Sequence, residues 1–471
     1  MTGPTTHIPE RAAPATRTNL VIGLLVGSAF VMILNETIMS VALPTLIVDL
    51  AVTASTAQWL TSGFFLTMAV VIPITGFLLQ RFTPRQVFVG AMSAFSTGTL
   101  VSALAPGYGV LLTGRIVQAV GTAVMIPLLM TTVLRLVPVQ RRGSMMGTIS
   151  IVIAVAPAVG PTISGLILSA LDWRFMFWLV LPIALLALGA GVALLRVDSE
   201  TRTVPLDVAS VALSAVGFAG FVYGLTAIGE AARGGALVPP WIPLVVGAAA
   251  LVVFVRRQLV LQRADRALLD LRPFTLRPFV VSIVLVVLSM MALFGALILL
   301  PLYLQDVLGT DPFVTGLVVL PGGLVMGLLG PFVGRAFDRI GARPLVIPGA
   351  VVLSGSLWAL TAFVGAPLWT VVVIHIVLSA GIALMLTPLM TEALGSLPAD
   401  LYSHGSAIVS TLQQVAGAAG TALFVTMLTL FSASGGATDA PGIRAAFLVG
   451  AILSTAAVGV SLLVRGRQPS P

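Results

Sequence analysis

The chain has 471 residues, of which 58% are apolar and 8% are charged, and its formal net charge is +8. Soluble domains carry about a quarter charged residues, so charge is too scarce here to coat the several water-exposed domains that this length would need. The composition therefore excludes a soluble protein and predicts an all-α protein that crosses the membrane many times.

Residue types that several kinds of site require are missing. All 24 basic residues are Arg, and without Lys neither a Walker-type phosphate loop nor a Schiff-base cofactor is available. The absence of Cys excludes disulfides and thiolate ligands, and His7, His375 and His404 are too far apart in sequence to indicate a metal cluster. We therefore expect no cofactor and no metal site, and the sequence lacks the groups of an enzyme.

A polar, Pro-rich tail covers residues 1–19, and apolar runs then recur to the end of the chain. Each run has about the ~20 residues that a helix needs to cross the ~30 Å hydrocarbon layer. The breakers between the runs predict fourteen spans, at 20–43, 57–80, 86–105, 108–134, 145–170, 174–195, 206–228, 236–255, 279–304, 313–337, 342–364, 367–394, 405–432 and 443–464.

The positions of Arg orient these spans. With the N-terminus in the cytoplasm, every Arg except Arg115, Arg174, Arg233 and Arg444 falls in a segment on the inner side. This distribution follows the positive-inside rule and requires an even number of spans with both termini cytoplasmic. It also accounts for the net charge, so no nucleic-acid partner is expected. We expect a multi-pass protein of the bacterial cytoplasmic (inner) membrane.

The longest connection, residues 256–278, contains RRQLVLQRADRALLDLRPFTLR. Leu and Val alternate with Arg at near-helical spacing, as in an amphipathic helix that lies on the inner membrane face. A solvated linker fits the same residues, and both interpretations stay open. The segment is too short for a soluble catalytic domain.

An internal repeat divides the chain. The loop GFLLQRFTPRQVF (76–88) follows the second span, and GRAFDRIGARPLV (334–346) follows the tenth. The matching positions are Gly76 with Gly334, Arg81 with Arg339, and Arg85 with Arg343, while Asp338 and Gly341 stand where the first loop has Gln80 and Thr83. The repeat predicts two six-helix bundles, 20–196 and 279–465, with two additional transmembrane helices at 206–255 and a cytoplasmic linker at 256–278. Such a duplication places a substrate cavity between the halves, near the membrane midplane.

Four stretches resemble motifs of the major facilitator superfamily. GRAFDRIGAR (334–343) resembles its signature loop, LLTGRIVQAVGTA (111–123) its fourth-helix motif, and APAVGPTISG (156–165) the fifth-helix motif of its exporters. LNETIMSVALP (34–44) is similar to the first-helix motif of its 14-span drug:proton antiporters, and the chain most resembles the lincomycin-resistance type of multidrug exporter. At Gln80 the sequence departs from the family, which has an acidic residue there.

The resemblance implies a major facilitator fold and proton-coupled efflux of amphipathic, often cationic, small molecules by alternating access. Protons would be the coupling ion, the lipid bilayer would surround the protein, and a monomer is expected. Two alternatives stay open: an exporter of an endogenous lipid or secondary metabolite in the same fold, and a membrane sensor or scaffold that does not transport.

Glu36 lies inside the first span, and Arg115 lies inside the fourth, which runs the opposite way. Each is about seven residues from the outer end of its span, so both lie roughly 10 Å below the outer boundary. In the resembled fold these two helices line the same half of the cavity, and Arg115 is the partner expected for Glu36. The pair could be a static ion pair. The favoured interpretation is a proton-coupling site, because burial favours the neutral acid whereas a nearby Arg favours the carboxylate.

The two repeated loops and the fifth span supply candidate conformational residues. Asp338 is expected near a helix N-terminus or an Arg, as part of an inner latch that breaks and reforms when the halves rock. Small residues and proline in the fifth span predict close packing that seals one face of the cavity. The candidates are Gly76, Arg81, Gly334, Asp338, Arg339, Gly341, Arg343, Gly160, Pro161 and Gly165.

Candidate substrate contacts are polar residues at or near the spans. They are Asn35, Gln118, Tyr303, Gln305, His375, Gln413 and Gln414, with Trp59, Phe64 and Phe294 as apolar walls. The 16 Met fit a broad pocket because the thioether side chain is adaptable, although they fit a lipid-facing surface equally well.

Overall fold

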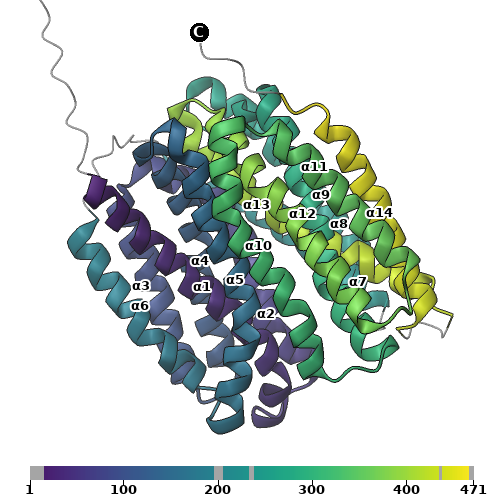
Figure 1. Ribbon diagram of the computed structural model, residues 1–471. Helices are drawn as coiled ribbons and strands as arrows, with labels where there is room; N and C mark the ends of the chain where they lie inside the picture. The colour runs from purple at the N-terminus through teal and green to yellow at the C-terminus, as the bar shows by residue number, and fades with distance from the viewer. Residues whose placement is uncertain (1–14, 196–204, 233–237, 434–437, 466–471) are drawn as a thin grey trace, which may run out of the picture.

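The computed structural model describes residues 15–195, 205–232, 238–433 and 438–465, so most of the expected tail 1–19 lies outside the described residues. Within these ranges the protein is helical (Figure 1). The α-helices are α1 (Ala15–Asp49), α2 (Ala54–Arg81), α3 (Pro84–Ala103), α4 (Tyr108–Leu136), α5 (Arg142–Ala170), α6 (Phe175–Leu194), α7 (Val208–Ala232), α8 (Trp241–Leu261), α9 (Arg277–Leu302), α10 (Pro312–Ile340), α11 (Arg343–Ala362), α12 (Leu368–Gly395), α13 (Tyr402–Leu430) and α14 (Ala440–Ser461).

The helices form two bundles, α1–α6 and α9–α14, which lie side by side (Figure 1). In the first bundle α3 packs between α4 and α6, and in the second α11 packs between α12 and α14. The described chain starts and ends at the same end of the molecule, at the top of Figure 1. We call this the terminal end and the opposite one the far end.

Two seams join the bundles. The α5–α10 seam is formed by α5 of the first bundle and α10 of the second, and the α2–α13 seam by α2 and α13. Smaller contacts between α4 and α13 and between α5 and α12 lie between the seams. Each seam thus pairs one helix from each half of the repeat.

The two added helices form a hairpin, α7 against α8. Arg257 of α8 donates two hydrogen bonds to Asp207, which comes just before α7, at 2.7 and 2.9 Å. Farther in, Gln258 donates to the hydroxyl of Ser210 at 2.8 Å. Helix α7 also packs against both α2 and α13, so the hairpin covers the α2–α13 seam and contacts both halves.

Twelve of the described helices are long and apolar enough to cross a membrane. The other two, α3 and α5, fall outside that set, so fourteen spans are not established. Helix α3 is less apolar because it carries small polar side chains, of which Ser96, Thr99 and Ser102 are buried within the protein.

The connection 256–278 does not form one amphipathic helix. Helix α8 continues to Leu261, and two short 3₁₀ turns follow at Gln262–Ala264 and Arg272–Thr275. Ala267, Leu268 and Leu269 between these turns are buried. Their burial shows that the segment packs into the protein, whereas a solvated linker would expose them.

Candidate functional site

Glycines bring the two halves into backbone contact along the α5–α10 seam. A Cβ atom on Gly334 would lie 2.1 Å from the carbonyl oxygen of Gly143, and one on Gly147 would lie 2.2 Å from that of Gly330. Real Cβ atoms do not come this close to backbone, so only glycine fits at these positions. The close approach is a property of the closed seam, and any larger side chain would open it.

Asp338 fastens the terminal end of this seam. Its Oδ1 accepts a hydrogen bond from the Gly143 N–H at 2.8 Å, and its Oδ2 accepts one from the Ser144 N–H at 2.7 Å. Helix α5 begins at Arg142, so these N–H groups have no partner within the helix, and the helix dipole favours a negative charge beside them. A carboxylate of the second half thus caps a helix of the first half. This is one of the two positions that the sequence predicted for Asp338.

The α2–α13 seam is closed by neutral contacts. A Cβ on Gly76 of α2 would lie 2.8 Å from Nδ1 of His404, which shows how closely α13 approaches. Gln80 donates from Nε2 to the carbonyl oxygen of Asp400 at 3.5 Å. The amide at Gln80 therefore reaches across the seam, but without the charge that Asp338 brings to the other one.

Two hydroxyl pairs join the halves between the seams. Thr131 and Ser406 lie 2.8 Å apart, as do Ser150 and Thr387. Together with the two seams, they hold the halves against each other toward the terminal end.

A cavity of about 40 Å³ lies between the halves. Ligand pockets for drug-sized molecules measure about 300–1,000 Å³, so the halves would have to separate before such a molecule could enter. Five methionines from α4, α5, α9, α10 and α12 line the cavity, with Ser150, Thr387 and Gln413 as its polar groups; they are Met130, Met146, Met290, Met326 and Met390. The sequence predicted Gln413. For the methionine lining, the number of Met residues was the only indication.

Arg115 is fully buried among neighbours from its own bundle. Its Nη1 donates to Oε1 of Gln118 at 3.0 Å, and its Nε donates to the carbonyl oxygen of Leu60 at 3.5 Å. The guanidinium carbon lies 4.2 Å from the ring centre of Phe64. Gln118 in turn donates to the Thr99 hydroxyl at 2.8 Å. Gln118 and Phe64 therefore hold Arg115 and do not line the cavity.

Glu36 is half-buried on α1, which packs against α4. The ion pairs among the described residues do not include the expected pair of Glu36 with Arg115, although the two charges lie near enough to attract each other. In the same described set, Nη2 of Arg115 and Nδ2 of Asn35 are buried without a hydrogen-bond partner. Buried polar atoms are rarely left unpaired, so each of these two donors marks a place for water or a polar ligand.

Three predicted substrate contacts lie elsewhere. The hydroxyl of Tyr303 accepts a hydrogen bond from the Gly365 N–H at 2.7 Å, within the second bundle. Gln305 is exposed in the turn that follows α9. His375 lies 3.3 Å from the carbonyl oxygen of Val319, and packs α12 against α10. None of the three lines the cavity, because they lie at the far end or in the interior of one bundle.

Of the remaining polar and aromatic candidates, two lie at or beside the α2–α13 seam and one lies within the second bundle. Gln414 donates from Nε2 to the sulfur of Met68 at 3.7 Å, across the α2–α13 seam. Trp59 stacks on Tyr223 of α7, with ring centres 5.8 Å apart. Phe294 packs on Gly417 within the second bundle.

The arginines and Gly341 of the repeated loops lie at helix ends. Gly341 ends α10 with φ +83°, a conformation that favours glycine. Arg339 belongs to the last turn of α10, and Arg343 is the first residue of α11. Arg81 lies 5.9 Å from the ring centre of Phe77 in the last turns of α2.

The fifth-helix motif packs closely at one of its positions. A Cβ on Gly160 would lie 2.2 Å from the hydroxyl oxygen of Thr37 on α1, next to Glu36, whereas one on Gly165 would meet nothing within 4 Å. The side chain of Pro161 lies outside what the structure describes. Helix α5 therefore packs closely against α1 as well as against α10.

Residues 25–421 match the Major Facilitator Superfamily. The chain is 41% identical over 458 residues to the lincomycin resistance protein LmrB of Listeria monocytogenes serovar 1/2a, covering 94% of this chain and 96% of that protein. It is 29% identical over 411 residues to the multidrug resistance protein B homolog of Mycobacterium tuberculosis, covering 86% of this chain and 75% of that one. The solved structure of the proton:xylose symporter XylE aligns with a TM-score of 0.67 at 15% identity, covering 96% of this chain and 97% of XylE.

Proposed function

This chain belongs to the Major Facilitator Superfamily, and we propose that it is a proton-driven exporter of amphipathic, often cationic, compounds that works by alternating access. It is a multi-pass membrane transporter and not an enzyme. The names of two relatives, which refer to lincomycin resistance and multidrug resistance, support drug efflux. Proton coupling, the substrate class and the cellular membrane are the parts proposed here.

One observation carries the proposal: a methionine-lined cavity lies between the two halves, and the contacts that hold the halves together at one end can separate. Thioether side chains are flexible and polarizable, so a lining of five Met suits compounds of varied shape. The fastening consists of hydrogen bonds and glycine contacts, which can break and reform as the halves rock. Separation of the halves at the terminal end would admit substrate to the cavity.

Glu36 is the proposed proton carrier. It lies on α1 and feels the charge of Arg115 without a direct ion pair, so its proton affinity would follow water access from either side. One proton moving down ~150 mV supplies about 3.5 kcal/mol, at ~2.3 kcal/mol per charge per 100 mV. At 1.4 kcal/mol per decade, this supports a gradient of roughly a few hundred-fold for a neutral substrate.

We propose further that the terminal end faces the cytoplasm of a bacterium and that all fourteen α-helices cross its inner membrane. This arrangement gives a 14-span drug:proton antiporter with both termini cytoplasmic. The clustering of Arg in the segments at the terminal end supports it, because such segments stay on the inner side. Helices α3 and α5 each pack between neighbours that are long and apolar enough to span. A single chain holds both halves of the cavity, which supports a monomer.

The test is substrate-driven proton exchange by Glu36→Gln in proteoliposomes. The amide is nearly isosteric but cannot ionise, so we expect proton-driven export to fall to background while the protein folds and still binds substrate. Lincomycin and a panel of lipophilic cations are the substrates, and substrate-induced proton release in detergent is the second readout. The matched control is Glu392→Gln on α12, the same change at another half-buried acid, which should transport like the parent.

Proton release that is unchanged in Glu36→Gln would reject Glu36 as the proton carrier. A parent protein that moves no panel compound but transports an envelope lipid or a secondary metabolite would favour the exporter of an endogenous compound. A parent that binds compounds yet transports nothing under a pH gradient would favour a sensor.

A further inference from the structure

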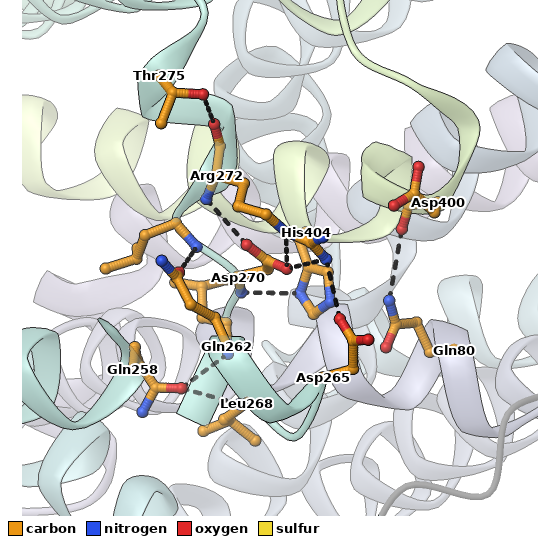
Figure 2. A network of polar contacts seen from close by, with 12 residues as sticks. Gln80, Gln258, Gln262, Asp265, Leu268, Asp270, Arg272, Thr275, Asp400 and His404 are labelled. Carbon is orange, nitrogen blue, oxygen red and sulfur yellow. Dashed lines mark hydrogen bonds and ion pairs between the residues drawn. The ribbon is translucent and has the colours of Figure 1, made fainter. Parts of the chain in front are cut away.

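The connection between α8 and α9 packs against the α2–α13 seam at the terminal end (Figure 2). We call residues 262–276 the strap. Asp270, in the middle of the strap, is only 3% exposed, which is unusual for an acidic residue in a connection between helices. The strap therefore packs as part of the protein and is held in one position.

Gln258 of the added hairpin holds the strap, and Gln262 closes a turn within the strap. Oε1 of Gln258 accepts hydrogen bonds from the N–H groups of Leu268 at 2.8 Å and Leu269 at 3.2 Å (Figure 2). Oε1 of Gln262 accepts one from the Leu271 N–H at 3.2 Å. Because Gln258 also bonds to Ser210 of α7, the strap, α7 and α8 form one connected unit.

A hydrogen bond connects the strap to α13. The N–H of Asp270 donates to Nδ1 of His404 at 3.3 Å (Figure 2). His404 is 3% exposed, in the first turn of α13, and it packs on Gly76 of α2. The imidazole thus lies where α2, α13 and the strap meet.

The direction of this bond fixes the charge of the imidazole. A ring nitrogen that accepts a hydrogen bond carries no proton, so His404 is neutral with its proton on Nε2. A proton added to Nδ1 would point at the Asp270 N–H, and two donors facing each other cannot bond. Protonation of His404 is therefore incompatible with the observed contact.

The charged groups around His404 do not offer an easy alternative. Asp270 and Asp400 would attract an imidazolium, whereas Arg272 would repel it. Both oxygens of Asp270 are already engaged, Oδ1 by the Arg272 N–H at 2.8 Å and Oδ2 by the Arg272 side chain at 2.7 Å. An imidazolium would therefore have to share Asp270 with the positively charged Arg272, and the strap N–H would have to move away from Nδ1. From helix α2, the uncharged Gly76 packs on His404, and the uncharged Gln80 donates to the carbonyl oxygen of Asp400.

We propose that His404 and the strap form a proton-responsive clasp, which holds the α2–α13 seam closed while His404 is neutral and releases it when His404 is protonated. The clasp rests on the proposed function in that the terminal end is taken to face the cytoplasm. His404 is then a second residue that responds to protons, separate from Glu36, and it links cytoplasmic acidity to opening of the inner side.

The test measures the distance between the halves at the terminal end. The chain has no Cys, so spin labels can be attached at Gln140→Cys and Ala399→Cys, two exposed positions in the turns before α5 and α13. We expect the population with the longer distance to rise several-fold from pH 8 to pH 5.5. In His404→Gln the amide oxygen can accept the Asp270 N–H and does not titrate, so the distance should stay short at both pH values.

Gln258→Leu tests the strap without touching His404. This variant removes the acceptor for two strap N–H groups, so the longer distance should be enriched already at pH 8. Glu36→Gln should keep the pH response, which separates the clasp from proton carriage by Glu36. The clasp is overturned if the parent shows no response, if His404→Gln still responds, or if Gln258→Leu matches the parent at pH 8.

Discussion

At the scale of single residues, a buried side chain is often held by groups that its own sequence neighbourhood does not reveal. The guanidinium of Arg115 bonds to Gln118 and to the Leu60 carbonyl, and packs on the ring of Phe64. These contacts orient the guanidinium within the first bundle, and the ion pairs among the described residues do not include one between Arg115 and Glu36. Such an arrangement suits the proposed role of Glu36, which is to bind and release a proton, because a tight ion pair would fix the carboxylate in its charged form.

Asp207 shows the opposite case, a carboxylate fixed in its charged form. Hydrogen bonds from the Arg257 side chain lower its pKa to about 2, from an ordinary value of 3.8. Because the folded-state pKa is the lower one, the stabilisation is complete above about pH 4 and is lost as the pH falls through about 2. Asp207→Asn should therefore flatten the fall in stability between pH 4 and pH 2 and cost under about 1 kcal/mol at neutral pH.

Thermal unfolding in detergent at pH 2, 3, 4 and 6 would measure this effect. Asp306→Asn, at an exposed position in the turn after α9, is the control and should follow the parent curve. If Asp207→Asn also follows the parent curve, the pair with Arg257 does not stabilise the hairpin.

How much of the site could be predicted differs from residue to residue. The depth of Glu36 and Arg115 follows from helix rise and span limits, and Asp338 was expected at a helix N-terminus or an Arg. The partners of Arg115 on another helix could not be predicted, because Leu60 and Phe64 lie on α2, whose rotation about its axis the sequence does not define. Tyr303 and His375 were misplaced for the same reason: a polar residue in a span can face its own bundle as well as the cavity.

At the scale of helices, the α5–α10 seam depends on the absence of side chains. The glycines of the repeated loop and of α5 were recognised as motif residues, but which pairs meet depends on how the two helices cross. Helix limits were more predictable: the twelfth span was expected at 367–394, and α12 covers Leu368–Gly395. Helix α1 was expected to stop at residue 43, because the proline at position 44 was interpreted as a breaker. In the structure the helix runs on to Asp49.

Gly334→Ala should force the seam apart. The new Cβ would lie 2.1 Å from the Gly143 carbonyl oxygen, so α5 and α10 must separate and the Asp338 bonds must lengthen. We expect a several-fold loss of transport and greater accessibility of the terminal end of the cavity to a thiol reagent, with Ser150→Cys as the reporter in this Cys-free chain.

The matched control is Gly355→Ala on α11, where an added Cβ meets nothing within 4 Å. In that position Ala should be harmless or stabilise the helix by up to about 1 kcal/mol, because it restricts the unfolded chain. Equal behaviour of the two variants would show that the close contact at Gly334 has no role in the seam.

At the scale of the whole molecule, the halves meet in one arrangement, and the proposed alternating access requires others. The contacts at the α5–α10 seam, the α2–α13 seam and the two hydroxyl pairs all hold the halves together toward the terminal end. The cavity that they enclose is far smaller than a drug-sized ligand needs. Transport therefore requires that these contacts separate together in each cycle.

Ser150→Cys with Thr387→Cys should lock this arrangement. The two hydroxyl oxygens lie 2.8 Å apart, one on each half, so the thiols should form a disulfide under mild oxidation. We expect transport in proteoliposomes to stop on oxidation and to return on reduction, while each single variant stays active throughout. Full activity of the oxidised, cross-linked protein would mean that the halves need not part at this end.

The packing of α7 on both α2 and α13 has a consequence for this motion. A helix in contact with two bodies that rotate apart cannot keep its register with both, so it must slide along one of them. In this protein, sliding of α7 would then limit the rate of the transport cycle and how widely the halves open. Substitutions of small residues on that surface would change the rate of the cycle without changing the affinity for substrate.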